Sequence, residues 1–160
     1  MKNKIFLSPS RYIQGTEILS HLSEYIQTLG SRILLLTSAG NRNRFKDVLT
    51  ELSSDEKCTV VTEVFSGECT MAEIHRLCRV CKKERIEAVA GLGGGKTIDT
   101  VKAVSHYMDL RLAVIPTAAS SDAPCSALSI IYKEDGSLDQ LLWLRANPDL
   151  VLMDVGVIAR

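Results

Sequence analysis

The chain has 160 residues, the length of one globular domain. Hydrophobic residues make up 46% and charged residues 24%, ordinary proportions that exclude a disordered chain. Basic and acidic residues number 19 each, so the formal net charge is zero and gives no support to binding of nucleic acid or an anionic membrane. No apolar run is long enough to span a bilayer, and the first residues do not resemble a signal peptide. We therefore expect a cytoplasmic domain.

Short apolar runs alternate with amphipathic segments along the chain. Strands are expected at 33–37, 58–65, 87–91, 112–115 and 150–153. Helices are expected between them, at 17–29, 41–53, 71–84 and 96–108. Several strands are continuously apolar, which is typical of parallel strands covered by helices on both faces. The alternation predicts an α/β fold, a Rossmann-like, doubly wound and mainly parallel sheet.

The pattern changes after Pro116. A loop of small residues at 117–126 precedes two apolar runs, 128–132 and 138–144, which flank an Asp-Gly turn and predict a β-hairpin insertion. No helix is expected after the last strand. We expect residues 1–160 to form a single nucleotide-binding domain.

The five cysteines are odd in number and lack a secretory leader, which predicts reduced thiols. Cys78 and Cys81 fall at helical spacing with Ile74 and Leu77, so both thiols are expected to pack as small hydrophobic groups. No second cysteine pair or His-x-x-x-His follows to complete a zinc site.

Four of the five positions from the last residue of the strand at 87–91 up to the helix at 96–108 are glycines: Gly91, Gly93, Gly94 and Gly95. Glycine lets the backbone turn tightly and lets a ligand approach closely. Free N–H groups and the dipole at a helix start attract an anion. This turn therefore predicts a binding site for a diphosphate.

Two known phosphate motifs each miss by one residue. The dinucleotide fingerprint G-x-G-x-x-G begins at Gly91 but has Lys96 in place of its third glycine. The phosphate loop G-x-x-x-x-G-K-[ST] matches at Gly95, Lys96 and Thr97 but has Ala90 in place of its first glycine. The run Leu150–Asp154 also resembles an apolar strand that ends in a magnesium-binding aspartate. Spacing alone leaves a dinucleotide and a nucleoside triphosphate as alternatives.

Hydroxyl groups and one carboxylate gather in the loop after the strand at 112–115, at Thr117, Ser120, Ser121, Asp122 and Ser126. Ligands of open α/β sheets bind beyond the carboxyl ends of the strands, so this loop and the glycine turn are expected to face one crevice. Asp122 is suited either to receive alcohol hydroxyls or to cap a turn.

The segments 93–102, 114–132 and 147–154 resemble the glycerol dehydrogenases of the iron-containing (group III) alcohol dehydrogenase superfamily. The resemblance extends over essentially the whole chain. It implies an N-terminal NAD-binding domain of an enzyme of glycerol metabolism. That enzyme oxidises glycerol, or a related vicinal diol, to the hydroxyketone by metal-assisted hydride transfer. It also implies a homo-oligomer.

The resemblance assigns roles residue by residue. Gly94, Gly95 and Lys96 would hold the pyrophosphate, and Asp122 a substrate hydroxyl. The nicotinamide half would contact Thr117, Ser120, Ser126, Leu128 and Tyr132. One position departs from the family, because Ser38 stands where an aspartate commonly binds the adenosine ribose. The departure predicts weaker discrimination against NADP, with Arg42 or Arg44 available for a 2′-phosphate.

The family binds zinc or another divalent metal through an aspartate and two histidines of a following helical domain. The chain is expected to be truncated before that C-terminal helical domain. Its histidines, His21, His75 and His106, lie on separate predicted helices, whereas a catalytic zinc needs about three convergent ligands. We therefore expect no catalytic and no metal-binding residue in this chain. The alternatives are a stand-alone nucleotide-binding module without turnover and a degenerate phosphate-loop ATPase or kinase.

Overall fold

The computed structural model describes residues 5–159. Its centre is a six-stranded, wholly parallel sheet with the strand order β1-β8-β5-β4-β2-β3. The six strands are β1 (Arg11–Gly15), β2 (Arg32–Thr37), β3 (Thr59–Val64), β4 (Ala88–Gly93), β5 (Arg111–Pro116) and β8 (Leu150–Asp154). An antiparallel hairpin stands apart, formed by β6 (Leu128–Tyr132) and β7 (Leu138–Trp143). The predicted fold class is confirmed.

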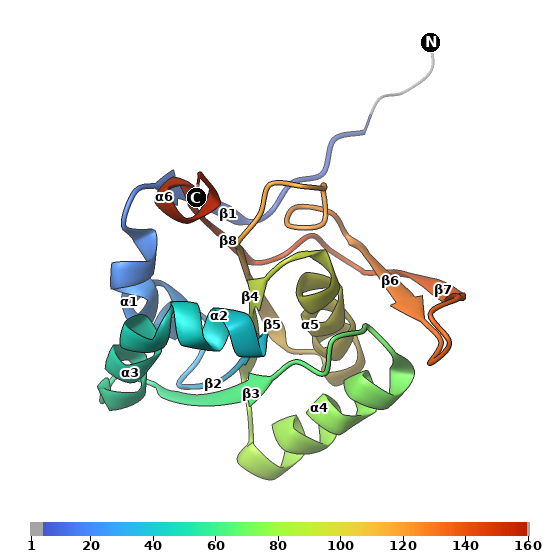
Figure 1. Cartoon of the computed structure of the whole chain (residues 1–160), viewed down its shortest axis with the longest axis horizontal. Helices are drawn as coiled ribbons and strands as arrows, with labels where there is room; N and C mark the ends of the chain where they lie inside the picture. Colours follow the sequence, from blue (N-terminus) through green and yellow to red (C-terminus); the bar gives the residue numbers. More distant parts are fainter. Residues whose placement is uncertain (1–4, 160) are drawn as a thin grey trace.

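Helices cover both faces of the sheet (Figure 1). The α-helices are α1 (Leu22–Ile26), α2 (Ala39–Arg44), α3 (Lys46–Ser54), α4 (Met71–Glu84), α5 (Gly95–Met108) and α6 (Val155–Ile158). Two short 3₁₀ helices, η1 (Ile18–His21) and η2 (Gln27–Leu29), flank α1. The helices α1, α2 and α3 lie on one side, while α4, α5 and the hairpin lie on the other.

The central strands divide their side chains between two cores. Successive residues of a strand point to opposite faces. Accordingly Ile33 and Leu35 of β2 join the core beneath α1 and α3, whereas Leu34 and Leu36 join the core beneath α4 and α5. All four are fully buried, which explains why the sequence shows a continuous apolar run.

Two predicted helices are interrupted in the structure. The segment expected at 17–29 consists of η1, α1 and η2, because the apolar spacing of three residues at each end fits a 3₁₀ turn as well as an α-helix. The segment expected at 41–53 consists of α2 and α3, which meet at the buried Phe45. The helices at 71–84 and 96–108 are confirmed, the latter beginning one residue earlier.

Two elements at the ends of the described chain were not predicted. The strand β1 is a largely exposed edge strand that pairs with β8, so its apolar pattern is weak. The expectation of no helix after the last strand was wrong, because α6 follows β8 directly. The Asp154 carboxylate starts α6 by accepting hydrogen bonds from the Gly156 and Val157 amides at 3.0 and 3.2 Å, and it accepts another from the Leu19 amide at 3.1 Å. Asp154 therefore caps a helix and ties η1 to the sheet.

The five cysteines are unpaired thiols. Cys81 is buried in the core beneath α4, as the sequence predicted, and burial raises the pKa of its thiol to about 12. Within residues 5–159, no helix combines the length and the apolar character that crossing a bilayer requires.

Candidate functional site

The glycine turn joins β4 to α5, and its glycines do two different jobs. A Cβ on Gly93 would lie 2.7 Å from Thr97 Oγ1, and one on Gly91 would lie 2.6 Å from Val101 Cγ2. These two glycines let α5 pack directly against β4. A Cβ on Gly94 would meet no atom within 4 Å, and one on Gly95 would only approach Ser121 Oγ at 4.0 Å. Gly94 and Gly95 therefore leave an open surface at the start of α5.

The N-terminus of α5 is available to an anion. Its N-cap residue, Gly94, has no side chain with which to cap the helix. The first N–H groups of a helix have no intrahelical partner, and the helix dipole adds partial positive charge there. An α-helix of 14 residues with a bare glycine N-cap is a suitable binding site for phosphate.

The structure contradicts the phosphate-loop ATPase alternative. That motif would need a phosphate-binding loop beginning at residue 90, but Ala90 lies inside β4, is fully buried and pairs with Ala113 of β5. The strand continues to Gly93 before the chain turns. The turn is therefore too short for the motif.

Lys96 stands on the first turn of α5 and forms an ion pair with Glu68 from the loop after β3. The Nζ–Oε2 distance is 2.5 Å, and the Glu68 Oε1 atom accepts a hydrogen bond from the Cys69 amide at 3.0 Å. The hydrogen bond with Lys96 lowers the pKa of Glu68, and the same contact raises the pKa of Lys96. The Lys96 side chain is 58% exposed and stands beside the open glycine surface.

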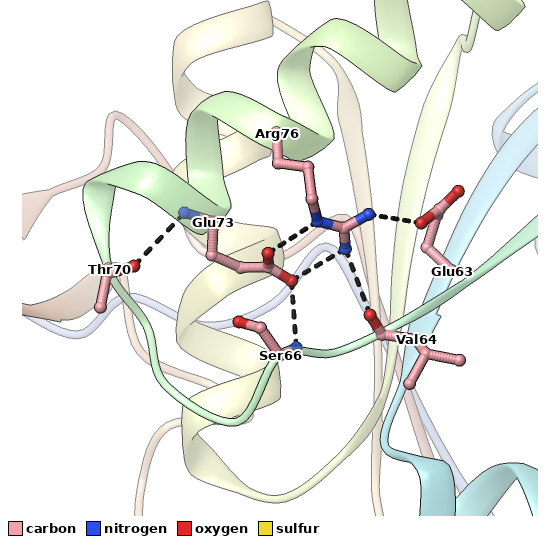
Figure 2. Close-up of polar contacts among 6 residues, drawn as sticks. All are labelled: Glu63, Val64, Ser66, Thr70, Glu73 and Arg76. Carbon is pink, nitrogen blue, oxygen red and sulfur yellow. Dashed lines mark hydrogen bonds and ion pairs between the residues drawn. The ribbon is translucent and has the colours of Figure 1, made fainter. Parts of the chain in front are cut away.

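A network on α4 fixes the loop that carries Glu68 (Figure 2). The Glu73 carboxylate, on a side chain only 3% exposed, accepts hydrogen bonds from the Ser66 amide at 3.2 Å and from Arg76. Arg76 also donates to Glu63 Oε2 at 2.5 Å and to the Val64 carbonyl at 3.2 Å. Burial opposes ionisation of Glu73, but the bonds from Arg76 and Ser66 outweigh it and lower the pKa of Glu73. The start of the loop is thus held against α4.

The loop after β5 reaches the glycine turn directly. The Thr117 amide donates a hydrogen bond to the Gly93 carbonyl at 3.0 Å. Further along, Cys125 and Ser126 donate their amides to the Asp122 carbonyl at 2.9 and 3.1 Å, which folds this part of the loop into a turn. The Asp122 side chain is exposed, as is Ser120.

The hairpin closes this side of the site. The Tyr132 amide donates to the Cys69 carbonyl at 2.8 Å, which joins the end of β6 to the loop that carries Glu68. Leu128, at the start of β6, is half-buried and lines a hollow of about 530 Å³ together with Asp122, Ser126 and Trp143.

Ser38 lies at the same edge of the sheet. It follows Thr37, which pairs with Leu92 of β4, so Ser38 stands beside Gly93 in the neighbouring strand. Its hydroxyl accepts a hydrogen bond from the Asn41 amide at 3.1 Å and caps α2. Arg44, considered as a partner for a 2′-phosphate, donates to the Val157 carbonyl at 2.9 Å.

The predicted site residues that follow β2, β4 and β5 therefore lie together at the carboxyl edge of the sheet, with the hairpin beside them. Three residues of this region were not predicted as site residues: Glu68, Asp99 and Lys102. Glu68 lies just after a predicted strand, a position that a search for loops at the carboxyl edge could have found. Lys102 falls on the apolar stripe of a predicted helix with Ile98 and Val101, and a charge in such a stripe indicates a buried partner.

Residues 5–159 contain no group of three or more histidine, cysteine, aspartate or glutamate side chains arranged to hold a metal ion. His21, at the end of η1, contacts Glu24 of α1, and His106 lies against Tyr107 on α5. The described residues therefore do not fit a catalytic metal centre.

The open glycine turn and the hydroxyl-rich loop lie at the carboxyl edge of a parallel, doubly wound α/β sheet, the edge at which folds of this class bind ligands. Residues 9–155 match the family of iron-containing alcohol dehydrogenases, and the chain belongs to that family. It is 38% identical to a glycerol dehydrogenase of Escherichia coli O6:H1 over 157 residues, which cover 98% of this chain and 43% of that relative.

Two solved structures have the same fold. A probable glycerol dehydrogenase from Sinorhizobium meliloti 1021 superimposes with a TM-score of 0.88 at 36% identity, covering 98% of this chain and 42% of that one. The glycerol dehydrogenase from Schizosaccharomyces pombe gives a TM-score of 0.87 at 33% identity, covering 100% and 41%. The chain thus spans less than half the length of these relatives.

Proposed function

We propose that this chain binds NAD(H) as the coenzyme-binding part of a dehydrogenase that oxidises glycerol or a related vicinal diol to the hydroxyketone. The observation that carries the proposal is the open surface at Gly94 and Gly95 beside the Lys96 ammonium group. The proposal is also supported by the 38% identity of nearly the whole chain to a glycerol dehydrogenase.

The pyrophosphate of the coenzyme would occupy the N-terminus of α5. The bare amides of the first turn would donate to its oxygens, and Lys96 would neutralise part of its charge. Lys96 can do so without leaving Glu68, because an ammonium group has three donors. Glu68, held by the Cys69 amide, then keeps the Lys96 Nζ atom close to the helix start.

The nicotinamide half would lie along the loop after β5, contacting Thr117, Ser120, Ser126, Leu128 and Tyr132. When bound, the nicotinamide ring supplies the acceptor for the hydride. Asp122 would accept a hydrogen bond from a substrate hydroxyl, and its exposed position on the rim of the 530 Å³ hollow is compatible with that role. Ser38 would face the adenosine ribose with a neutral hydroxyl.

The metal-assisted part of the reaction is not assigned to these residues, because residues 5–159 do not fit a metal centre. This favours, as the second candidate, a nucleotide-binding module without turnover by this chain alone. Binding of zinc or another divalent metal by the full-length enzyme, and assembly into a homo-oligomer, stay predictions.

Thermal unfolding in the presence of ligands tests the proposal. NADH should raise the unfolding temperature and Mg-ATP should not, because a ligand stabilises only the state that binds it. Substituting Lys96→Ala should weaken NADH binding by about 1.5–3 kcal/mol, the usual contribution of a hydrogen bond to a charged group. Lys133→Ala, an exposed lysine in the hairpin turn, provides the matched control. Stabilisation by Mg-ATP without a response to NADH would refute the proposal.

A further inference from the structure

Lys102 is a lysine with no exposed surface, and it lies beneath the loop after β5. Its side chain is 0% exposed, and the residue stands two turns into α5. The Nζ atom donates hydrogen bonds to Ser126 Oγ at 3.1 Å and to the Leu128 carbonyl at 2.9 Å. Its ionic partner is Asp99, one turn earlier on α5, at 3.9 Å.

Both hydrogen bonds connect α5 to residues outside the helix, on the side of the site where the coenzyme is proposed to bind. Ser126 and Leu128 are two of the residues proposed to contact the nicotinamide half. The Ser126 amide also donates a hydrogen bond to the Asp122 carbonyl. The contact between Lys102 and Ser126 therefore fixes the turn that carries Asp122, whose carboxylate is proposed to bind the substrate hydroxyl. A buried ammonium group is costly, so its position on α5 requires these partners.

The same helix therefore touches both halves of the proposed site. Its N-terminus, at Gly94 and Gly95, presents amides to the pyrophosphate. Lys102 lies about 10 Å further along the axis at 1.5 Å per residue, and there it holds the loop for the nicotinamide. A rigid helix that contacts both ends sets the spacing between them.

We propose that Lys102 is a positioning residue that fixes the nicotinamide-side loop relative to the pyrophosphate site, with Asp99 as its counter-ion. The inference rests on the proposed function, and it adds a residue that touches neither coenzyme nor substrate. Asp99 is further joined to the hairpin by its own carbonyl, which accepts a hydrogen bond from Ser129 Oγ at 2.8 Å. The loop and hairpin are thus attached to α5 by three hydrogen bonds within two turns of the helix.

The test compares two ligands that both contain the pyrophosphate, of which only NADH carries the nicotinamide. NADH and ADP-ribose are titrated calorimetrically into the wild-type chain and into the Lys102→Met variant, which keeps the length of the side chain without its donors. Affinity for NADH should fall by about tenfold or more, because two hydrogen bonds that hold the loop are lost, while affinity for ADP-ribose should stay close to the wild-type value. A substitution that only destabilises the whole domain would lower the affinity for both ligands by the same factor.

Two further variants separate the causes. Asp99→Asn keeps both hydrogen bonds of Lys102 to the loop, so its ratio of NADH to ADP-ribose affinity should match the wild type. Lys133→Met controls for the loss of one positive charge at an exposed site. If Lys102→Met fails to fold because Asp99 is left without its partner, the double variant Asp99→Asn/Lys102→Met carries the same comparison.

The inference would be overturned if the folded variant lost affinity for NADH and ADP-ribose equally, or lost affinity for neither. Failure of both Lys102 variants to fold would also overturn it. A wild-type chain that binds neither ligand would instead refute the proposed function. A wild-type chain that binds NADH, together with a Lys102→Met variant that binds it equally well, would leave the proposed function standing and remove the role of Lys102.

Discussion

Two alanine substitutions in the glycine turn should change stability in opposite directions. Gly93 and Gly95 both have backbone angles that alanine adopts freely, so only the space around the new Cβ differs. In Gly93→Ala the Cβ would lie 2.7 Å from Thr97 Oγ1 and 2.8 Å from Thr97 Cβ, which forces α5 away from β4. Overpacking of this kind costs about 1–3 kcal/mol.

In Gly95→Ala the nearest atom to the new Cβ would be Ser121 Oγ at 4.0 Å, which is ordinary contact. Alanine is the better helix former by up to about 1 kcal/mol, so this variant should be as stable as the wild type or more so. The same methyl group would cover the amides proposed to receive the pyrophosphate. NADH affinity should therefore fall by about tenfold or more, the equivalent of one lost hydrogen bond to a charged group.

Thermal unfolding followed by circular dichroism measures the first effect, with about 2–4 °C expected per kcal/mol for a chain of this size. Fluorescence titration with NADH measures the second. A Gly95→Ala variant that unfolds earlier than the wild type would contradict the packing argument. One that keeps full NADH affinity would contradict the placement of the pyrophosphate.

Two further predictions concern charged groups. Arg76→Met should lower the free energy of unfolding by up to about 3 kcal/mol in urea titrations, because it leaves the buried Glu73 carboxylate with a single amide partner. Glu63→Gln, which keeps the contact between Arg76 and Glu73, should cost clearly less, and equal losses would contradict this reasoning. Burial raises the pKa of Asp99 from 3.8 to about 6 in the folded chain, so its ionisation removes stability as the pH rises through that window. The stability of Asp99→Asn relative to the wild type should therefore increase between pH 3.8 and about 6, and a flat or falling difference would contradict the burial of Asp99.

Local sequence determined the elements with strong patterns. The helix α4 was predicted with its observed bounds because Ile74, Leu77 and Cys81 repeat at helical spacing. In the structure the Thr70 hydroxyl caps this helix by accepting a hydrogen bond from the Glu73 amide. The continuous apolar run of β2 predicted a strand buried on both faces. The glycine turn was visible because glycine clusters are unfavourable unless the backbone must approach something closely. The resemblance to known dehydrogenases then led to NAD as the proposed coenzyme.

Tertiary structure decided what depends on contacts between distant segments. The edge strand β1 exists because β8 offers it a partner, and no apolar pattern of its own predicted it. Composition cannot tell which two of the four glycines serve packing, since only the position of α5 against β4 separates Gly93 from Gly95. The contacts of Lys96 with Glu68 and of Lys102 with Ser126 join residues that are far apart in the chain. Such pairs form only after folding places two loops at one edge of the sheet, because the energy of a charged contact depends on distance and burial rather than on sequence spacing.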